Sequence, residues 1–257
     1  MRIRITRRGI LGLAIGAALF FLAMVAFHPL LAFAVLFTSH MLMLWPTLAA
    51  NSPWWGPVVT GFVPNEKEIW LTIDDGPQPR DTPALLDLLD EHQAQATFFV
   101  KGKRAEQYPG LIHEIVRRGH TVGNHTYNHP SGSFWALSKD RLRAEIDDCS
   151  NGLKNVTGKT PEFFRAVAGM KNFFVHPLLA RRGLQLIGWS ARGFDTTTRD
   201  IDRVLNRIFR RLQPGGIVLL HEDTPITREC LRRFLGRAKT EGYHCVIPQT
   251  ERLVAQG

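Results

Sequence analysis

The stretch Leu71-Thr72-Ile73-Asp74-Asp75-Gly76-Pro77 ends an apolar run on two adjacent carboxylates. In residues 69–73, Ile or Leu alternates with Trp70 and Thr72, which predicts a buried strand. The Gly-Pro pair after the carboxylates predicts that this strand ends in a turn. Two neighbouring acids repel each other, and a bound cation would remove that cost. The stretch alone fits either an ordinary Asp-rich turn or a metal-binding carboxylate beside a free acid that moves protons.

Downstream of this strand, strand-like and helix-like segments alternate regularly along the chain. The predicted strands are apolar runs, which is typical of a parallel sheet covered by helices. We therefore expect an α/β fold, a distorted or incomplete (β/α) barrel of about seven parallel strands. The expected strands are 68–75, 96–101, 120–125, 163–165, 184–190, 216–221 and 243–247, and the expected helices are 81–92, 111–118, 137–156, 177–182, 198–212 and 225–240.

Polar side chains follow the ends of five predicted strands. In a parallel barrel all carboxyl ends share one face, where active sites form. His125 and His129 would point at one site if residues 125–129 turn helically. One carboxylate and two imidazoles make three ligands with open positions for water and substrate, which is typical of a catalytic zinc site. The strand-end residues are Asp74 with Asp75, His125 with His129, Arg165, Asp195 and His221.

The sequence resembles the polysaccharide deacetylases, which form carbohydrate esterase family four and carry the NodB-homology domain. Thr72-Ile73-Asp74-Asp75-Gly76-Pro77 is similar to the family's Thr-Phe-Asp-Asp-Gly-Pro. Residues 125–129 are similar to its His-Ser/Thr-x-x-His, and residues 218–221 to its Leu-x-Leu-His. The resemblance covers residues 67–250, so this segment is the expected catalytic domain, and residues 51–66 are interpreted as a short tether.

The resemblance implies a divalent metal, most of all zinc, bound by Asp75, His125 and His129. Such a metal would polarise the acyl oxygen and lower the pKa of a bound water. The backbone N–H of Tyr127 would help to bind the oxyanion that forms when water attacks the acyl carbon.

The resemblance also implies four catalytic residues. Asp74 would be the base that takes a proton from the attacking water, and Arg165 would pair with Asp74. His221 would be the general acid that protonates the leaving amine, a task that suits a pKa near neutrality. Asp195 would orient His221.

Two motifs depart from the family pattern. The third is usually Arg-x-Pro-x-Gly, and residues 165–169 lack the proline. The fourth is usually Asp-x-x-Asp-Trp, and residues 192–196 carry Arg192 in place of the first Asp and Thr196 in place of the Trp. These changes alter the predicted groove walls and remove no expected ligand or proton carrier. Arg192 fits either a substrate-binding residue that meets a phosphate or carboxylate, or an ordinary surface arginine.

The first 50 residues are predicted to be a membrane segment, because residues 9–50 are almost wholly apolar and follow a basic start. They are long enough for two spans of roughly 20 residues each, 9–27 and 30–50, divided at His28-Pro29. The basic residues should stay in the cytoplasm, which indicates an anchor in the bacterial inner membrane. One span would place the domain outside the cytoplasm and two would return it, and the sequence leaves both open.

Composition excludes several other classes of protein. The net charge is +9, and the basic residues form no run with interleaved aromatic residues, so nucleic acid is not an expected partner. The three cysteines, Cys149, Cys230 and Cys245, contain no Cys-x-x-Cys pair, which argues against a disulfide framework and a thiolate zinc site. The sequence indicates no oligomeric state.

The expected activity is hydrolysis of a carbon–nitrogen bond other than a peptide bond. The substrate would be an amino sugar that carries an acetyl or formyl group, in an envelope polysaccharide or a lipid-linked glycan. Two alternatives remain, a catalytically impaired carbohydrate-binding protein on the same scaffold and an amidase that acts on a non-sugar substrate. The complete set of expected ligands and proton carriers argues against the binding protein.

Overall fold

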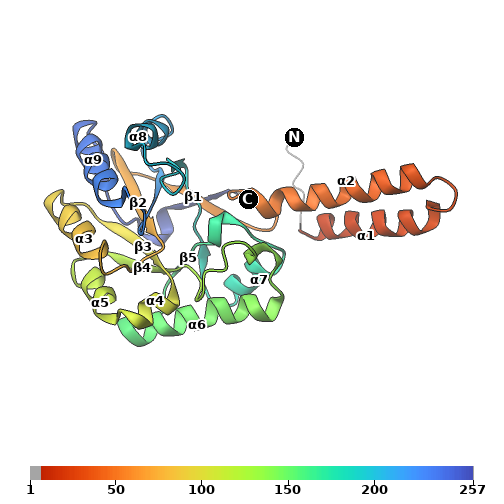
Figure 1. Cartoon of the computed structure of the whole chain (residues 1–257), viewed down its shortest axis with the longest axis horizontal. Helices are drawn as coiled ribbons and strands as arrows, with labels where there is room; N and C mark the ends of the chain where they lie inside the picture. The colour runs from red at the N-terminus through yellow and green to blue at the C-terminus, as the bar shows by residue number, and fades with distance from the viewer. Residues whose placement is uncertain (1–6, 257) are drawn as a thin grey trace.

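A hairpin of two long helices projects from an α/β domain (Figure 1). The computed structural model describes residues 7–256, so Arg2 and Arg4 of the basic start lie outside this range. The hairpin consists of α1 (Arg7–Met24) and α2 (Pro29–Leu48), which lie side by side and run in opposite directions. Pro29 begins α2, as expected for a residue that cannot donate a hydrogen bond inside a helix.

The hairpin occupies the two predicted membrane spans. Among the described helices, α2 is the one that is long and apolar enough to cross a membrane, and the apolar part of α1 (Arg8–Met24) is shorter. Length and composition are equally compatible with a signal sequence, so the two spans stay predictions.

The domain is built on a curled sheet whose seven main strands run parallel. Their order across the sheet is β6-β5-β4-β3-β2-β8-β7, and the short β9 pairs with the start of β2. This arrangement confirms the predicted α/β fold, an incomplete barrel of seven parallel strands. The strands are β2 (Glu68–Asp74), β3 (Ala96–Val100), β4 (Thr121–Asn124), β5 (Phe163–Phe164), β6 (Gln185–Leu186), β7 (Ala191–Arg192), β8 (Ile217–His221) and β9 (His244–Cys245).

The strand predicted at 184–190 contains only β6, and the chain then crosses to β7, which begins at Ala191 at the opposite edge of the sheet. Between them the Ile187 N–H donates to the Phe164 carbonyl at 2.9 Å, and the Ser190 N–H donates to the Ile217 carbonyl at 3.0 Å. This short segment therefore crosses from one edge to the other and brings the edges together. An apolar run does not reveal which neighbour each residue pairs with, so the sequence pattern could not show the division.

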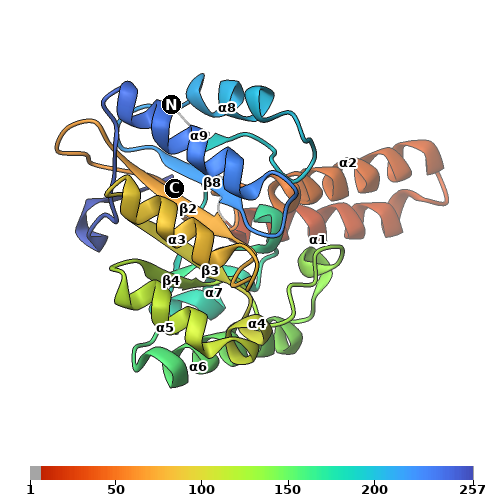
Figure 2. The same ribbon diagram turned by 60° about the vertical axis from the view of Figure 1, so that its left-hand side comes forward.

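Helices cover the outer face of the sheet (Figure 2). The Asp200 side chain accepts a hydrogen bond from the Arg203 N–H at 2.9 Å, which explains why α8 begins at Ile201 and not at the predicted position 198. The helices are α3 (Thr82–Glu91), α4 (Gly102–Gln107), α5 (Pro109–Arg117), α6 (Lys139–Thr157), α7 (Val175–Ala180), α8 (Ile201–Phe209) and α9 (Thr227–Thr240), with 3₁₀ turns at Phe134–Ala136, Val167–Gly169 and Thr250–Arg252.

The alternation of side chains in β2 determines where its carboxylate lies. Leu71 and Ile73 pack into the core between the sheet and the outer helices. Trp70 packs on the other face of the strand, inside the barrel, against the cluster that contains Leu219. Because side chains alternate along a strand, Asp74 also points into the barrel, where it is 3% exposed.

Residues 51–66, which are predicted above to be a tether, are packed against the domain. They contain β1 (Val58–Phe62), which pairs antiparallel with β10 (Leu253–Gln256) in a small second sheet. Val58 and Phe62 are buried in this segment, so burial of its apolar residues explains why it has regular structure. The domain thus includes chain on both sides of the predicted limits 67–250.

Candidate active site

Asp74 and Arg165 form a buried ion pair inside the barrel. The fully buried Arg165 donates from Nη1 to Asp74 Oδ1 at 2.8 Å and to Thr72 Oγ1 at 2.7 Å. It also donates to the carbonyls of Ile187 at 3.2 Å and Gly188 at 2.9 Å. Burial lowers the pKa of the Arg165 guanidinium, and the Asp74 carboxylate opposes that fall. Since a buried charge needs satisfied hydrogen bonds, these contacts fix a cation against one oxygen of Asp74.

Asp75, His125 and His129 bring three ligand atoms together. Asp75 Oδ1 lies 3.2 Å from His129 Nε2 and 3.9 Å from His125 Nε2, and all three ligand atoms lie within 4.8 Å of one another. His125 Nδ1 is 2.8 Å from the Arg165 carbonyl, so Nδ1 carries the proton and Nε2 faces the cluster. A carboxylate and two imidazoles in this arrangement fit a divalent ion such as zinc.

The ionisation of this cluster suits metal binding. Burial alone would raise the pKa of Asp75, but His125 and Lys101 outweigh burial and hold that pKa well below its usual range. Burial, helped by the neighbouring His125, lowers the pKa of His129 to about 4. At neutral pH Asp75 is therefore charged and His129 neutral, which are the forms that bind metals.

The segment 125–129 is not the helical turn on which the predicted convergence of the two imidazoles depended. Thr126 has φ of 66° and His129 has φ of 56°, both in the left-handed region that a β-branched residue such as Thr rarely adopts. The Thr126 N–H donates to Asn124 Oδ1 at 2.8 Å and holds this turn. The rings of His125 and His129 nevertheless lie 4.7 Å apart, so an irregular turn gives the convergence.

His221 and Asp195 lie beside the ion pair of Asp74. His221 is the register partner of Asp74 across the β2–β8 pair. Asp195 accepts from His221 Nδ1 at 2.9 Å and from the His221 N–H at 2.8 Å. Burial alone would lower the pKa of His221, but the Asp195 carboxylate outweighs burial and raises it. Because Nδ1 is used by Asp195, Nε2 is the nitrogen that remains for a substrate.

Arg192 lies in β7 opposite Leu219 of β8, and Tyr127 lies between the two ligand histidines in the chain. The Arg192 guanidinium stacks on the rings of Trp189 (5.2 Å) and Phe194 (4.7 Å), and its buried Nε has no hydrogen-bond partner among the described residues. The Tyr127 hydroxyl donates to Glu106 at 2.8 Å, away from the ligand cluster. The backbone N–H of Tyr127 has no partner within residues 7–256, so it is free to donate.

Lys101 is a site residue that the sequence patterns did not single out. Its Nζ lies 2.9 Å from Asp75 Oδ1. Lys101 directly follows β3, so it stands at a strand end as the other site residues do. That position is the signal that could have identified it.

Glu222, directly after His221, is a second residue near the site that the sequence patterns did not single out. It is 1% exposed, and its carboxyl group accepts from Thr82 Oγ1 at 2.6 Å and from the Gln78 N–H at 3.2 Å. Burial raises the pKa of Glu222 to about 8. A Cβ at Gly76 would lie 2.2 Å from Glu222 Oε1, so this side chain supports the turn that follows the two carboxylates.

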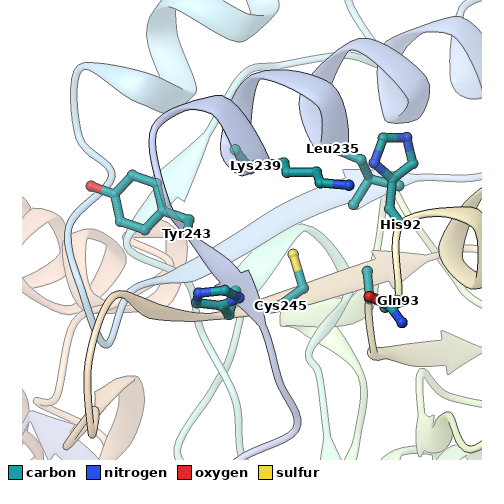
Figure 3. A pocket seen from close by; sticks show the side chains of 9 residues that line it. His92, Gln93, Leu235, Lys239, Tyr243 and Cys245 are labelled. Atoms are coloured by element: carbon teal, nitrogen blue, oxygen red, sulfur yellow. The ribbon is translucent and has the colours of Figure 1, made fainter.

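A separate pocket lies at the opposite end of the sheet (Figure 3). It is lined by His92, Gln93, Lys239, Tyr243 and Cys245, among others. These residues come before β3, from the end of α9 and from β9, which pairs with the amino end of β2. The pocket therefore lies away from the strand ends that carry the candidate active site.

Comparisons with known proteins agree with this geometry. The family model for polysaccharide deacetylase matches residues 63–187. A peptidoglycan-N-acetylglucosamine deacetylase of Bacillus cereus is 36% identical over 194 residues, which cover 73% of this chain and 90% of that protein. A chitooligosaccharide deacetylase of Azorhizobium caulinodans is 33% identical over 162 residues, 63% of this chain and 76% of that protein.

A solved structure supports the same assignment. The family 4 carbohydrate esterase from Streptomyces lividans, in complex with acetate, superposes with a TM-score of 0.67 and 29% sequence identity. The match covers 76% of this chain and 100% of that one. Shared sequence, fold and strand-end motifs lead to one conclusion: the chain belongs to the polysaccharide deacetylase family.

Proposed function

We propose that this chain, a carbohydrate deacetylase by family, is a metal-dependent hydrolase that removes an acetyl or formyl group from the nitrogen of an amino sugar. The observation that carries the proposal is the pair of proton carriers beside one ligand cluster. Asp74, held by Arg165, lies next to His221, held by Asp195, and the ligand cluster adjoins both. The relatives named above are deacetylases of peptidoglycan N-acetylglucosamine and of chitooligosaccharides, which supports an amino-sugar glycan as the substrate, and a lipid-linked glycan is proposed beside it.

Asp74 is the proposed base. Arg165 occupies Oδ1, which leaves Oδ2 to take the proton from the attacking water. Oδ2 lies 3.7 Å from His125 Nε2, so this oxygen faces the ligand cluster. A divalent ion held by Asp75, His125 and His129 would polarise the acyl oxygen and make water more acidic. The free N–H of Tyr127 is the proposed donor to the oxyanion.

His221 is the proposed acid. As the carbon–nitrogen bond breaks, Nε2 of His221 gives its proton to the amine, which leaves as a neutral group. Asp195 stabilises the charged imidazole and fixes its orientation through Nδ1. Before the next cycle, Asp74 loses its gained proton to solvent and His221 takes one up.

The test of the proposal is release of acetate or formate from a panel of N-acylated amino-sugar glycans and lipid-linked sugars. Release by the wild-type protein would support the hydrolase. Binding of these glycans without release, by protein that contains its metal, would instead indicate the carbohydrate-binding alternative. Release from non-sugar amides alone would indicate the amidase.

Removal of the metal is expected to abolish release, and added zinc is expected to restore it. His129→Ala should weaken zinc binding by at least about tenfold, because outer-shell changes alone cost 10- to 100-fold. Titration calorimetry with zinc measures this without reference to activity. His113→Ala, on the exposed face of α5, is the matched control and should bind zinc as the wild type does. Unchanged affinity in His129→Ala would contradict the ligand assignment.

Asp195→Asn is expected to move the alkaline limb of the pH–rate profile to lower pH. The Asp195 carboxylate raises the pKa of His221, so its loss lowers that pKa, and the acid form of His221 is lost earlier as pH rises. The profile of kcat/KM against pH measures the shift, and an alkaline limb at an unchanged pH would argue against His221 as the acid.

A further inference from the structure

Lys171 is a fully buried lysine that joins the helical hairpin to the domain. Its ammonium donates to the carbonyls of Ala49 (2.8 Å), Ala50 (2.7 Å) and Gly169 (3.4 Å), so its three donors meet three acceptors. Its own N–H donates to the Thr47 carbonyl at 3.0 Å. Lys171 therefore satisfies carbonyls at the end of α2, where a helix lacks internal partners.

Further contacts hold the same junction. Asn51 Nδ2 donates to the Trp189 carbonyl at 2.6 Å. Gly169 has φ of 73°, and a Cβ there would lie 2.3 Å from the Ala50 Cβ and 2.8 Å from the Trp189 ring. The hairpin thus ends in a packed joint and not in a flexible linker.

This joint forms part of the wall of the candidate active site. Gly169 and Lys171 follow the carboxyl end of β5, and Trp189 follows that of β6, so the joint lies on the same edge of the sheet as the site. Contact continues inward, since the guanidinium of Arg165 lies 6.0 Å from the Trp189 ring and binds Asp74. In Figure 2, β2 and β8 run toward the side from which the hairpin projects.

The surface of the hairpin fits a lipid bilayer. Residues 9–65 contain no charged side chain, and the 20 residues of α2 span about 30 Å, the thickness of a hydrocarbon core. Leu22, Leu30 and Phe37 are among many large apolar side chains that the hairpin exposes. Trp45, 65% exposed, lies near the domain end of α2, where an interfacial aromatic is expected.

The hairpin returns the chain to the side where it starts. The first turn of α1, with the exposed Arg8, lies at the same end as the end of α2, next to the domain (Figure 1). Basic residues stay in the cytoplasm, so a hairpin inserted in this way keeps the domain there too. A finished envelope polymer lies on the other side of the membrane, whereas a lipid-linked sugar is present on the cytoplasmic face before export.

We propose that Lys171 locks the membrane hairpin to the groove wall, so that the active site faces the cytoplasmic surface of the bilayer and receives an amino sugar joined to a membrane lipid through a phosphate. This inference rests on the proposed function and selects among its substrates. Arg192, whose guanidinium stacks on the ring of Trp189 and whose Nε has no partner among the described residues, is the cation that meets the phosphate. Reactions that attach an acylated amino sugar to a lipid phosphate would supply such a substrate.

A depth measurement tests the orientation without activity. Single cysteines are introduced at Thr196, beside the site, and at Lys159, at the amino end of β5, both exposed. The three natural cysteines are buried and should label poorly. The full chain is placed in phosphatidylethanolamine–phosphatidylglycerol vesicles and labelled with a fluorophore. Nitroxide on the lipid headgroups should quench the label at position 196 at least about threefold more than at 159, since quenching needs close approach. Equal quenching would overturn the proposal.

Kinetics in the same vesicles test the substrate. The probes are polyprenyl-phosphate-linked N-acetylglucosamine in the vesicles and water-soluble N-acetylglucosamine 1-phosphate. The wild type should prefer the vesicle-borne probe by at least about tenfold in kcat/KM, because enzyme and substrate share a surface. Lys171→Met should lose most of this preference. A second variant serves if Lys171→Met fails to fold. It carries a Gly-Ser linker of about eight residues between Ala50 and Asn51, and it should also lose most of the preference for the vesicle-borne probe.

The outcomes separate the two proposals. The same linker inserted between the exposed Lys159 and Thr160 is the control and should change neither rate. Equal rates on both probes, unaffected by the linker at position 50, would leave the hydrolase standing and overturn the membrane-facing site. If neither probe reacts while acylated oligosaccharides do, the lipid-linked substrate is wrong. If no acylated sugar reacts with metal bound, the proposed function fails, and the quenching result still decides the orientation.

Discussion

Asp74→Asn is expected to lower kcat by about a thousandfold or more, within the upper range for loss of a general base. The amide keeps the shape of the side chain and can still accept from Arg165, but it cannot take a proton from water. The ligand cluster keeps Asp75, His125 and His129, so zinc should still bind. Acetate release gives kcat, and calorimetry gives the affinity for zinc.

A matched control separates the loss of a base from the loss of an ion pair. Asp147 also pairs with an arginine, Arg182, but on α6 outside the site. Asp147→Asn should keep kcat within about a few fold of wild type, as is usual for partly exposed pairs. If Asp74→Asn retained a tenth of the wild-type kcat, or if it lost zinc, Asp74 would not be the base.

The position of Asp74 could be predicted from sequence because it depends on local alternation. Every second side chain of the strand points into the barrel, so the carboxylate of Asp74 at the end of the strand points there too. The convergence of strand ends in a parallel sheet likewise follows from topology alone, and it groups Arg165, Asp195 and His221 with Asp74 as expected.

Other parts of the site depend on contacts between segments that no local pattern encodes. The convergence of the two imidazoles was expected if residues 125–129 turned helically, but the Asn124 side chain holds Thr126 in a left-handed conformation that its residue type disfavours. The charge of Lys101 suggested no role, because its partner Asp75 lies on another strand. Lys171 belongs to no motif, since two of its three acceptors, the Ala49 and Ala50 carbonyls, lie about 120 residues earlier in the chain.

The crossing segment shows the same limit at the level of the fold. Residues 184–190 read as one apolar strand, but β6 covers only residues 185–186 before the chain crosses to β7 at the other edge of the sheet. Closure of the barrel requires the Ile187 and Ser190 N–H groups to find acceptors on different strands. Hydrophobic periodicity predicts a strand but not the strands with which it pairs, so the position of the groove wall near Trp189 could not be predicted from the sequence.

His221→Ala is expected to lower kcat on N-acylated amino sugars by about 10² to 10⁴-fold, because an amine cannot leave as an anion and needs the proton of a general acid. The same variant should hydrolyse 4-nitrophenyl acetate at a rate within about a few fold of wild type, since that leaving group is stable without a proton and the role of the acid disappears. His244→Ala, with an exposed imidazole far from the strand ends, is the control for loss of a histidine.

The contrast between the two substrates distinguishes an acid from a structural residue. A collapsed groove would slow both reactions to the same degree, because each needs the base and the ligand cluster. The hydrogen bond between His221 and Asp195 gives a second test. The rate of Asp195→Asn on the amide should approach that of His221→Ala as pH rises, because the His221 imidazole without the Asp195 carboxylate then loses its proton. Equal losses on the amide and on the activated ester would show that His221 holds the site together and does not supply the proton.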